Sequence, residues 1–409
     1  MKTILLISRC PPYPLHLGDR LILWHLAREL SRRGYTIDLL ALYDQENDAG
    51  QTAEYADCFR RIELVREPRR DAMAYLRRIL FRSARFASSA DNSFCPPLWR
   101  TIDAYLKRYD YDLAHCFGAV SIYEFYPLFA HLPNLITPYE SHTHYLRSAA
   151  RQGRLSARAQ LPIARHFEGF MYSPFDRTVV ISDADRATLL ALQPALDIEV
   201  IPNGIELARF QPRELARDPH TLLFVGNFDY EPNQDAVRVL IKQILPQVRA
   251  RVPAAKLQLV GVNPPDWMRT LANDHIEVTG AVPDVTPYLA RATVFVCPLR
   301  YGAGLKNKVL EALAMRTPVA ATPLSVDGIN VRNGESAAVA PIEKIAEETA
   351  RLLMDESLHE ALAQKGRDLI EAQYTWERTA DRYERLYDEI CVAEPPPQTP
   401  LAISMASIP

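Results

Sequence analysis

The chain has 409 residues, of which 48% are hydrophobic and 24% charged, and its formal net charge is -3. At about 150 residues per domain this length predicts two or three domains, and the nearly balanced charge argues against a nucleic-acid-binding protein. The six cysteines form no C-x-x-C pair, so neither a zinc site nor a disulfide framework is indicated, and a reducing cytoplasm fits. No apolar run approaches the length of a membrane span. We expect a protein that is soluble or peripheral on a membrane.

The first 42 residues are typical of a doubly wound domain. The expected elements are a strand at Met1–Ser8, a helix at Arg20–Arg33 and a strand at Tyr35–Leu42. The loop between the first strand and the helix falls at the carboxyl end of the sheet, where ligands bind in such domains. Gly18 is therefore predicted to line a ligand site. Asp19 is predicted either to line the same site or to cap the helix.

Residues 60–86 carry nine arginines and three acidic residues, interleaved with apolar side chains. This pattern predicts a basic amphipathic helix, which can lie on an anionic membrane surface. The alternative is a solvated helix packed on the N-terminal domain with its arginines in water.

A second doubly wound sheet is expected after a linker. Residues 1–197 form the predicted N-terminal domain, 198–220 the linker and 221–373 the C-terminal domain. Residues 374–392 are expected to form a helix that crosses back to the N-terminal domain, and the proline-rich residues 393–409 a disordered tail. The expected elements of the second sheet begin with strand Leu222–Val225, helix Asp235–Arg251, strand Leu257–Gly261 and strand Ile276–Thr279.

The segment Leu299–Thr322 is the most informative part of the chain. It reads L-R-Y-G-A-G-L-K-N-K-V-L-E-A-L-A-M-R-T-P-V-A-A-T, after an apolar strand-like run at Thr293–Leu299. Only 15 of the 409 residues are glycine, against about 7% on average, so Gly302 and Gly304 before a helical pattern indicate a special turn. A strand, a glycine turn and a helix start direct free N–H groups and the helix dipole at one spot, which suits a phosphate or diphosphate.

Charged side chains of the following helix fit the same ligand. Glu311 is expected about 10 Å along the helix axis from the first helical N–H, a suitable distance for a carboxylate that accepts both ribose hydroxyls. Asn307 and Lys308 share its face, so a cation can project toward the phosphate charge. The alternative is a surface ion pair between Lys308 and Glu311, which would contribute little.

Other landmarks accompany this segment in a fixed order. They are Gly18, Y-D-L-A-H at Tyr111–His115, V-V-I-S-D-A-D at Val179–Asp185, I-P-N-G-I at Ile201–Ile205, L-F-V-G-N at Leu223–Asn227, V-T-G-A-V-P-D-V-T-P-Y at Val278–Tyr288 and Y-T-W-E at Tyr374–Glu377. Over nearly the whole chain this series resembles glycosyltransferase family 4, and N-K-V-L-E resembles a subset found in exopolysaccharide gene sets. The resemblance implies an α/β protein with the GT-B fold, in which two Rossmann-like doubly wound domains face each other across a cleft.

The chain departs from the family pattern at three positions. Ala303 stands where the family usually has the first of two glutamates, the one that contacts the donor sugar. Asn227 and Pro232 stand where an arginine and a lysine usually neutralise the departing diphosphate. We infer that Lys308, helped by Arg300 or Lys306, supplies the missing charge.

The resemblance also implies the roles of individual residues. Lys308, Arg300 and His142 are the predicted catalytic residues, with His142 reaching the donor sugar, although Glu140 falls nearer to the usual histidine position. The predicted donor-binding residues are Gly18, Asn227, Val282, Gly302, Ala303, Gly304, Leu305, Lys306, Asn307 and Glu311. No metal is expected, because Asp183 and Asp185, despite their D-x-D spacing, fit the charged start of a helix.

The implied reaction moves a sugar from a nucleoside diphosphate to an acceptor hydroxyl with retention of anomeric configuration. The nucleotide-sugar, by default a UDP-sugar, is a co-substrate and no further cofactor is expected. The expected acceptor is a glycan or a lipid-linked sugar, which favours membrane contact at the inner face of the cytoplasmic membrane, and no nucleic acid partner is expected. The alternatives are a non-catalytic nucleotide-sugar-binding subunit and a sugar-nucleotide 2-epimerase of the same fold.

Overall fold

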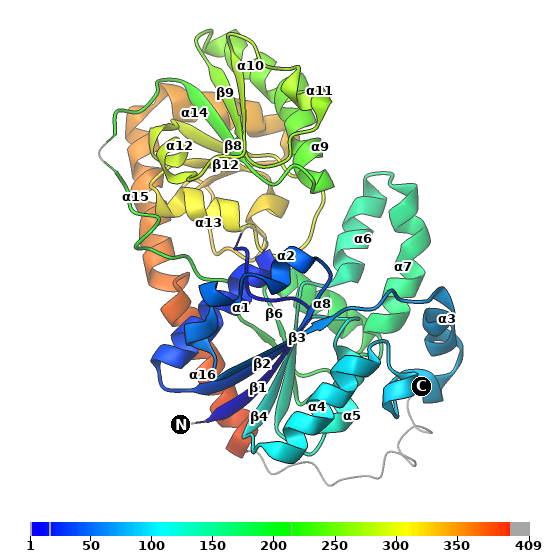
Figure 1. The fold of residues 1–409 in the computed structure, drawn as a ribbon. Coiled ribbons are helices and arrows are strands. Elements are labelled where there is room, and N and C mark those ends of the chain that lie inside the picture. Colours follow the sequence, from blue (N-terminus) through cyan, green and yellow to red (C-terminus); the bar gives the residue numbers. More distant parts are fainter. Residues whose placement is uncertain (1, 16–17, 214, 393–409) are drawn as a thin grey trace. The chain divides into compact units, whose positions relative to one another are not determined.

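The computed structural model describes residues 2–15, 18–213 and 215–392 (Figure 1). The chain divides into two compact units, and each is described by itself. The N-terminal unit comprises the described residues of Met1–His144, Ser156–Ile201 and Thr379–Pro409, and the C-terminal unit comprises Tyr145–Leu155 and Pro202–Arg378. The expected disordered tail at 393–409 lies outside the described residues.

The N-terminal unit is built on a seven-stranded parallel sheet with the order β3-β2-β1-β4-β5-β6-β7. Its strands are β1 Thr3–Ser8, β2 Thr36–Tyr43, β3 Arg61–Arg66, β4 Leu113–Phe117, β5 Asn134–Tyr139, β6 Arg177–Val180 and β7 Ile198–Val200. The central strands are almost continuously buried, which is typical of a parallel sheet covered by helices on both faces.

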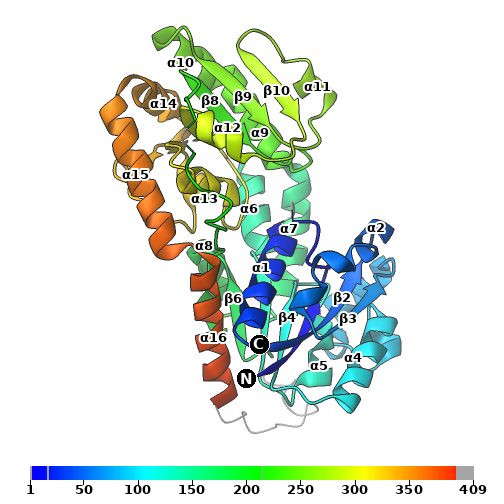
Figure 2. The same cartoon turned by 60° about the vertical axis from the view of Figure 1, so that its left-hand side comes forward.

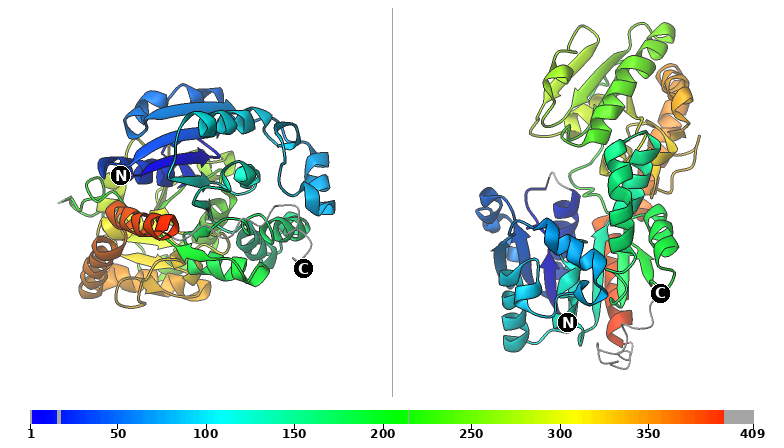
Figure 3. Two further views of the ribbon diagram at one scale, coloured as in Figure 1. Left: turned by 90° about the horizontal axis from the view of Figure 1, so that it is seen from below. Right: turned by 90° about the vertical axis from the view of Figure 1, so that its right-hand side faces the viewer.

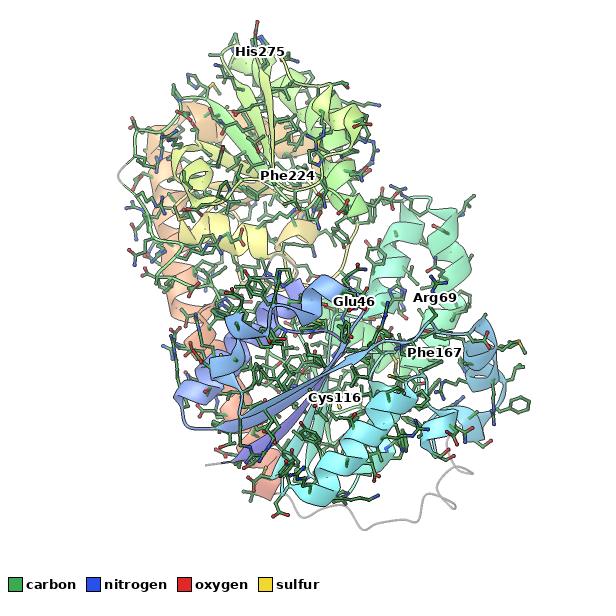
Figure 4. The ribbon with its side chains drawn as sticks, in the orientation of Figure 1. Glu46, Arg69, Cys116, Phe167, Phe224 and His275 are labelled. Carbon is green, nitrogen blue, oxygen red and sulfur yellow. The ribbon has the colours of Figure 1, made fainter. Side chains whose placement is uncertain are left out.

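Helices cover both faces of this sheet (Figure 2). The helices of this unit are α1 Gly18–Arg32, α2 Glu46–Ala49, α3 Ala72–Leu80, α4 Pro96–Arg108, α5 Tyr126–Phe129, α7 Leu155–Glu168, α8 Asp183–Leu192 and the greater part of α16 Trp376–Val392. The short helix α3 lies at the periphery, away from the sheet (Figure 1). Helix α6 His142–Arg151 begins in this unit and belongs to the C-terminal unit from Tyr145 onward. One apolar core, which includes Cys116 and Phe167 (Figure 4), joins the sheet to α4 and to the aromatic residues that follow α7.

Helix α16 completes the N-terminal unit from a distant part of the sequence. On β4, the fully buried His115 ring lies 2.7 Å from the Tyr387 hydroxyl through Nδ1 and 2.9 Å from Thr137 Oγ1 through Nε2. Burial lowers the pKa of His115 well below its ordinary value, so the ring is neutral. This histidine of the Y-D-L-A-H landmark therefore has a structural role that depends on α16.

Two predictions for the N-terminal half are wrong in detail. Residues 60–86 do not form one amphipathic helix: β3 is followed by Pro68 and then by the short helix α3, whose N-cap Asp71 accepts a hydrogen bond from Met73 N. Proline removes a backbone donor and Asp71 starts a new helix, so the segment is divided. Residues 198–200, expected in the linker, form edge strand β7, because Ile198 is buried against the first sheet.

The C-terminal unit has a six-stranded parallel sheet with the order β10-β9-β8-β11-β12-β13. Its strands are β8 Thr221–Val225, β9 Lys256–Val260, β10 Ile276–Gly280, β11 Val294–Cys297, β12 Val319–Ala321 and β13 Ala338–Val339. Its helices are α9 Glu231–Val239, α10 Leu245–Arg251, α11 Asp266–Arg269, α12 Thr286–Arg291, α13 Asn307–Ala314, α14 Ile345–Met354 and α15 Glu356–Gln373. The two parallel sheets confirm the predicted α/β class with two Rossmann-like domains (Figure 3).

The expected helix at Asp235–Arg251 begins four residues earlier, at Glu231, and runs through a π-helical turn into α10. Pro232 lies in its first turn, where a missing N–H costs nothing. Among the described residues, no helix is both long enough and apolar enough to cross a membrane.

Candidate functional site

The C-terminal sheet reverses its strand order between two neighbouring strands, β8 and β11. From β8 the chain proceeds outward through β9 and β10, whereas β11 starts the opposite half of the sheet. In doubly wound sheets, ligands bind outside the carboxyl ends of the strands at this switch point. The loop after Val225 and the loop after Cys297 lie there, and the second is the glycine turn singled out by the sequence.

The glycine turn adopts backbone conformations that require glycine. Gly302 has φ 139° and Gly304 has φ 66°, both in the region that side chains disfavour. Helix α13 (yellow in Figure 1) starts only at Asn307, four residues before Glu311. Glu311 therefore lies about 6 Å along the axis from the first helical residue, not the expected 10 Å. The helix starts late because the positive φ of Gly304 and the extended ψ of Lys306 keep Leu305 and Lys306 outside it.

Lys308 connects the two halves of the switch point. Its Nζ donates a 2.6 Å hydrogen bond to Asn233 Oδ1 at the start of α9 and lies 4.4 Å from the centroid of the Phe224 ring on β8 (Figure 4 labels Phe224). A Cβ added at Gly226 would lie 3.1 Å from this Nζ, so the ammonium sits directly beside the end of β8. Burial lowers the pKa of Lys308 to about 8. The structure thus places this cation beside the loop that in the family pattern carries an arginine and a lysine.

Glu311 is a half-buried carboxylate one turn further along α13. Burial raises its pKa, while the charges of Arg209 and Lys308 act in the opposite direction. The hydrogen bond of Lys308 goes to Asn233 and not to Glu311, so the alternative of a simple surface pair between Lys308 and Glu311 does not describe this site. A partly buried carboxylate is stabilised when hydroxyl groups of a ligand donate hydrogen bonds to it.

The other two predicted cations are engaged within the protein. Arg300 makes a two-pronged ion pair with the buried Asp235, with Nε 2.8 Å from Oδ2. Lys306 Nζ donates to the carbonyl oxygens of Ala303, at 2.8 Å, and Gly304. Asp235 already balances the charge of Arg300, and Lys306 holds the glycine turn in shape. Lys308 is thus the cation that the geometry favours for a ligand.

The remaining predicted residues of the C-terminal unit surround the same loops. Ala303 and Leu305 are buried within the glycine turn. Asn307 Oδ1 accepts a 2.9 Å hydrogen bond from Asn203, in the I-P-N-G-I landmark. Asn227 follows β8, and its backbone oxygen accepts a 2.7 Å hydrogen bond from Asn233. Val282 lies partly buried in the loop after β10, at the same end of the sheet.

Two predicted residues, Gly18 and His142, belong to the N-terminal unit and are described within it. Gly18 is the first residue of α1, and the next residue, Asp19, binds Arg9 at the end of β1, with Nε 2.9 Å from Oδ2. His142 starts α6, where its backbone N–H donates to the buried Glu168 at 2.7 Å. Burial lowers the pKa of the His142 ring, so it is neutral at pH 7.

The aspartates with D-x-D spacing start a helix, as predicted. Asp183 and Asp185 occupy the first turn of α8, and the N-cap Ser182 accepts a hydrogen bond from Asp185 N while donating one to its carboxylate. Asp185 also lies 3.2 Å from His144 Nδ1. Within the described part of the chain, no group of three His, Cys, Asp or Glu residues is arranged to hold a metal.

Sequence reasoning missed two buried polar residues, Asn233 and Asp235, which orient Lys308 and Arg300. Both lie in the helix that follows β8, directly after the L-F-V-G-N landmark. The sequence signal for these residues was their polarity in the first two turns of a helix at the switch point, where apolar core positions would otherwise be expected. Arg209, whose charge acts on Glu311, lies in the predicted linker and gave no such signal.

Comparison with known proteins supports the resemblance of this chain to glycosyltransferase family 4. Residues 21–209 match the family model described as Glycosyltransferase Family 4, and residues 219–355 match the model described as Glycosyl transferases group 1. A GDP-mannose-dependent alpha-(1-6)-phosphatidylinositol monomannoside mannosyltransferase from Mycobacterium tuberculosis is 27% identical over 57% of the chain and 66% of its own length, just under two thirds. A phosphatidyl-myo-inositol mannosyltransferase from the same species is 24% identical over 73% of the chain and 79% of its length.

Solved structures agree at the level of the fold. A sucrose-phosphate synthase from Thermosynechococcus elongatus has a TM-score of 0.73 at 21% identity, over 96% of this chain and all of that one. Anabaena HepE in complex with UDP-glucose has a TM-score of 0.64 at 11% identity, over 95% of this chain and all of that one. The chain belongs to glycosyltransferase family 4 and has the GT-B fold.

Proposed function

We propose that the protein transfers a sugar from a nucleoside-diphosphate-sugar to a hydroxyl of a glycan or lipid-linked acceptor, with retention of configuration. The observation that carries the proposal is the start of α13 at the switch point, where Lys308, Glu311 and the glycine turn converge. The first N–H groups of a helix have no partner within it and carry the positive end of its dipole, which suits a diphosphate.

In this proposal each group acts on a different part of the donor. The start of α13 holds the diphosphate, Lys308 balances the charge that develops on it, and Glu311 accepts hydrogen bonds from the ribose. His142 is proposed to contact the sugar and Val282 the base. The bond between the anomeric carbon and the phosphate oxygen breaks, the acceptor oxygen bonds to the same face of that carbon, and the acceptor proton passes to the departing diphosphate.

The names of the relatives guide the choice of donor and acceptor. The mycobacterial relative is named as GDP-mannose-dependent, and a relative from Rhizobium leguminosarum is named as a lipopolysaccharide core biosynthesis mannosyltransferase. The structure of HepE contains UDP-glucose. We therefore place GDP-mannose beside UDP-sugars as candidate donors and a glycolipid at the cytoplasmic face of a membrane as the candidate acceptor.

Thermal stabilisation by UDP, GDP, ADP and their common sugars tests the donor site directly. One nucleotide is expected to raise Tm selectively, and the increase should disappear in Glu311→Ala but persist in Glu343→Ala, which removes an exposed carboxylate of the same unit. Transfer with the selected donor, followed by NMR of the anomeric proton in the product, then tests retention. Equal Tm values with every nucleotide, or a product of inverted configuration, would contradict the proposal.

Donor affinity is expected to fall as the pH rises above about 8. The free protein loses the Lys308 proton near this pH because burial lowers its pKa to about 8. A diphosphate beside Nζ stabilises the charged amine and raises its pKa, so binding above pH 8 takes up a proton and weakens by up to about tenfold per pH unit. Calorimetric titrations from pH 7 to 10 measure this slope, which Lys308→Met should abolish. A wild-type slope that persists in Lys308→Met would assign the proton to another group.

A non-catalytic nucleotide-sugar-binding subunit is a second candidate function. It is favoured by the replacement of a family glutamate by Ala303 and by the engagement of Arg300 with Asp235. Both candidates predict nucleotide binding, so turnover separates them. Release of free nucleoside diphosphate in the presence of acceptor supports the transferase, whereas tight donor binding without turnover supports the binding subunit.

A further inference from the structure

In an ordinary amphipathic surface helix, apolar side chains face the protein and charged side chains face water. Helix α3 has the opposite arrangement. Arg78 points inward and is 4% exposed, whereas Met73, Leu76 and Leu80 on the same helix are 64%, 43% and 63% exposed, and the next residue, Phe81, is 57% exposed. We call these four side chains the α3 apolar stripe. They are four of the ten large apolar side chains that are exposed among the described residues.

Specific contacts fix this orientation. Arg78 pairs with the fully buried Glu124 and donates to the Ala84 carbonyl at 2.8 Å. On the same inner side, the Tyr75 ring lies 5.0 Å from that of Phe94 and 5.9 Å from that of Phe167. The helix is therefore held by its inner side, and the α3 apolar stripe remains outside. Figures 1 and 3 show α3 at the periphery of the N-terminal unit, away from its sheet.

Positive charge surrounds the α3 apolar stripe. Residues 69–85 contain six arginines and one acidic residue, Asp71, which caps the helix. Arg70 and Arg78 pair with carboxylates, whereas Arg69 (labelled in Figure 4), Arg77 and Arg82 are exposed. The interface of an anionic bilayer has negative charge at its surface and apolar acyl chains a few ångströms below. Exposed apolar side chains next to arginines are complementary to such an interface.

We propose that the α3 apolar stripe and the arginines around it dock the N-terminal unit onto anionic membranes. The stripe enters the headgroup region while Arg69, Arg77 and Arg82 contact lipid phosphates. A protein partner lacking negative charge would leave Arg69 and Arg77 without compensation, so the charge favours the bilayer as the occupant. This inference rests on the proposed function in one respect, because a lipid-linked acceptor would lie at a membrane. Its test measures membrane binding and does not require turnover.

Co-sedimentation of the full chain with vesicles tests the docking surface. Binding is expected to vesicles of phosphatidylcholine and phosphatidylglycerol mixed two to one, but not to phosphatidylcholine alone, and to weaken at high salt. The double variant Leu76→Glu, Leu80→Glu should lower the partition coefficient about tenfold or more, and Arg77→Glu should lower it by a smaller factor. Met354→Glu, at an exposed apolar residue of the C-terminal unit, should bind like the wild type.

Several outcomes would overturn this assignment. They are absence of wild-type binding to the mixed vesicles, equal binding by the double variant, and light scattering that shows a dimer in the wild type but a monomer in the double variant. Circular dichroism and Tm of each variant confirm that it is folded. Because donor binding is measured separately, failure here leaves the proposed transferase untouched, and loss of donor binding leaves the docking surface untouched.

Discussion

Replacing Lys308 with methionine is expected to lower kcat by about 10²- to 10³-fold while the protein stays folded. The family arginine and lysine positions are Asn227 and Pro232, and Arg300 and Lys306 are engaged with Asp235 and with loop carbonyls. Of the three cations predicted around the glycine turn, Lys308 is then the one available to balance the charge of a departing diphosphate. Methionine has a similar shape and removes a half-buried charge, so the fold should tolerate it. Steady-state kinetics with the donor selected by thermal stabilisation measures the effect.

A matched control is Lys365→Met, which makes the same substitution at an exposed position of α15 in the same unit. Its kcat and KM should equal those of the wild type. Turnover by Lys308→Met within threefold of the wild-type rate would mean that the helix dipole and backbone N–H groups suffice, and that Lys308 serves only to hold Asn233.

Replacing Arg78 with alanine is expected to lower the free energy of unfolding of the N-terminal unit by about 3–5 kcal/mol. The substitution leaves Glu124 as a fully buried carboxylate without its guanidinium partner, although Phe94 N and Ser93 Oγ still donate to it at 2.8 Å. Burial already raises the pKa of Glu124, and loss of Arg78 raises it further. The stability deficit should therefore shrink as the pH falls and Glu124 becomes protonated. Urea unfolding followed by circular dichroism measures this deficit.

The neighbouring Arg77→Ala provides the control, because Arg77 is exposed on the same helix and should change stability by less than about 0.5 kcal/mol. The double variant Arg78→Ala, Glu124→Gln should recover part of the loss, since no buried charge remains. A loss below about 1 kcal/mol in Arg78→Ala would show that water or another group compensates Glu124, and that α3 is held mainly by Tyr75 and its aromatic neighbours.

The sequence was sufficient to predict the backbone conformation of the proposed donor site. A strand, two glycines and a helix were predictable around Gly302 and Gly304 because each is dictated locally: apolar runs form buried strands, and positive φ values require glycine. The start of α13 was misplaced by about one turn. Helix starts are set by dihedral angles such as those of Lys306, which spacing alone does not specify.

The partners of the charged side chains were not predictable. Arg300 and Asp235 are 65 residues apart, and Lys308 and Asn233 are 75 apart, so only the strand order brings them together. The same limitation applies to α3. Its alternating arginines and apolar residues fit either orientation of the helix, and Glu124, 46 residues from Arg78, determines which side faces inward.

The return of α16 to the first sheet has a consequence for the order of events during translation. The ribosome releases β4 early, but Tyr387, which contacts the ring of His115, emerges only after the whole C-terminal unit has been made. Until then the nascent sheet lacks the cover that α16 provides, and His115 lacks the hydroxyl that its Nδ1 contacts in the complete unit. Domains generally fold as they leave the ribosome, N-terminal first. Here the unit that is synthesised first cannot be complete until α16, near the end of the chain, has emerged.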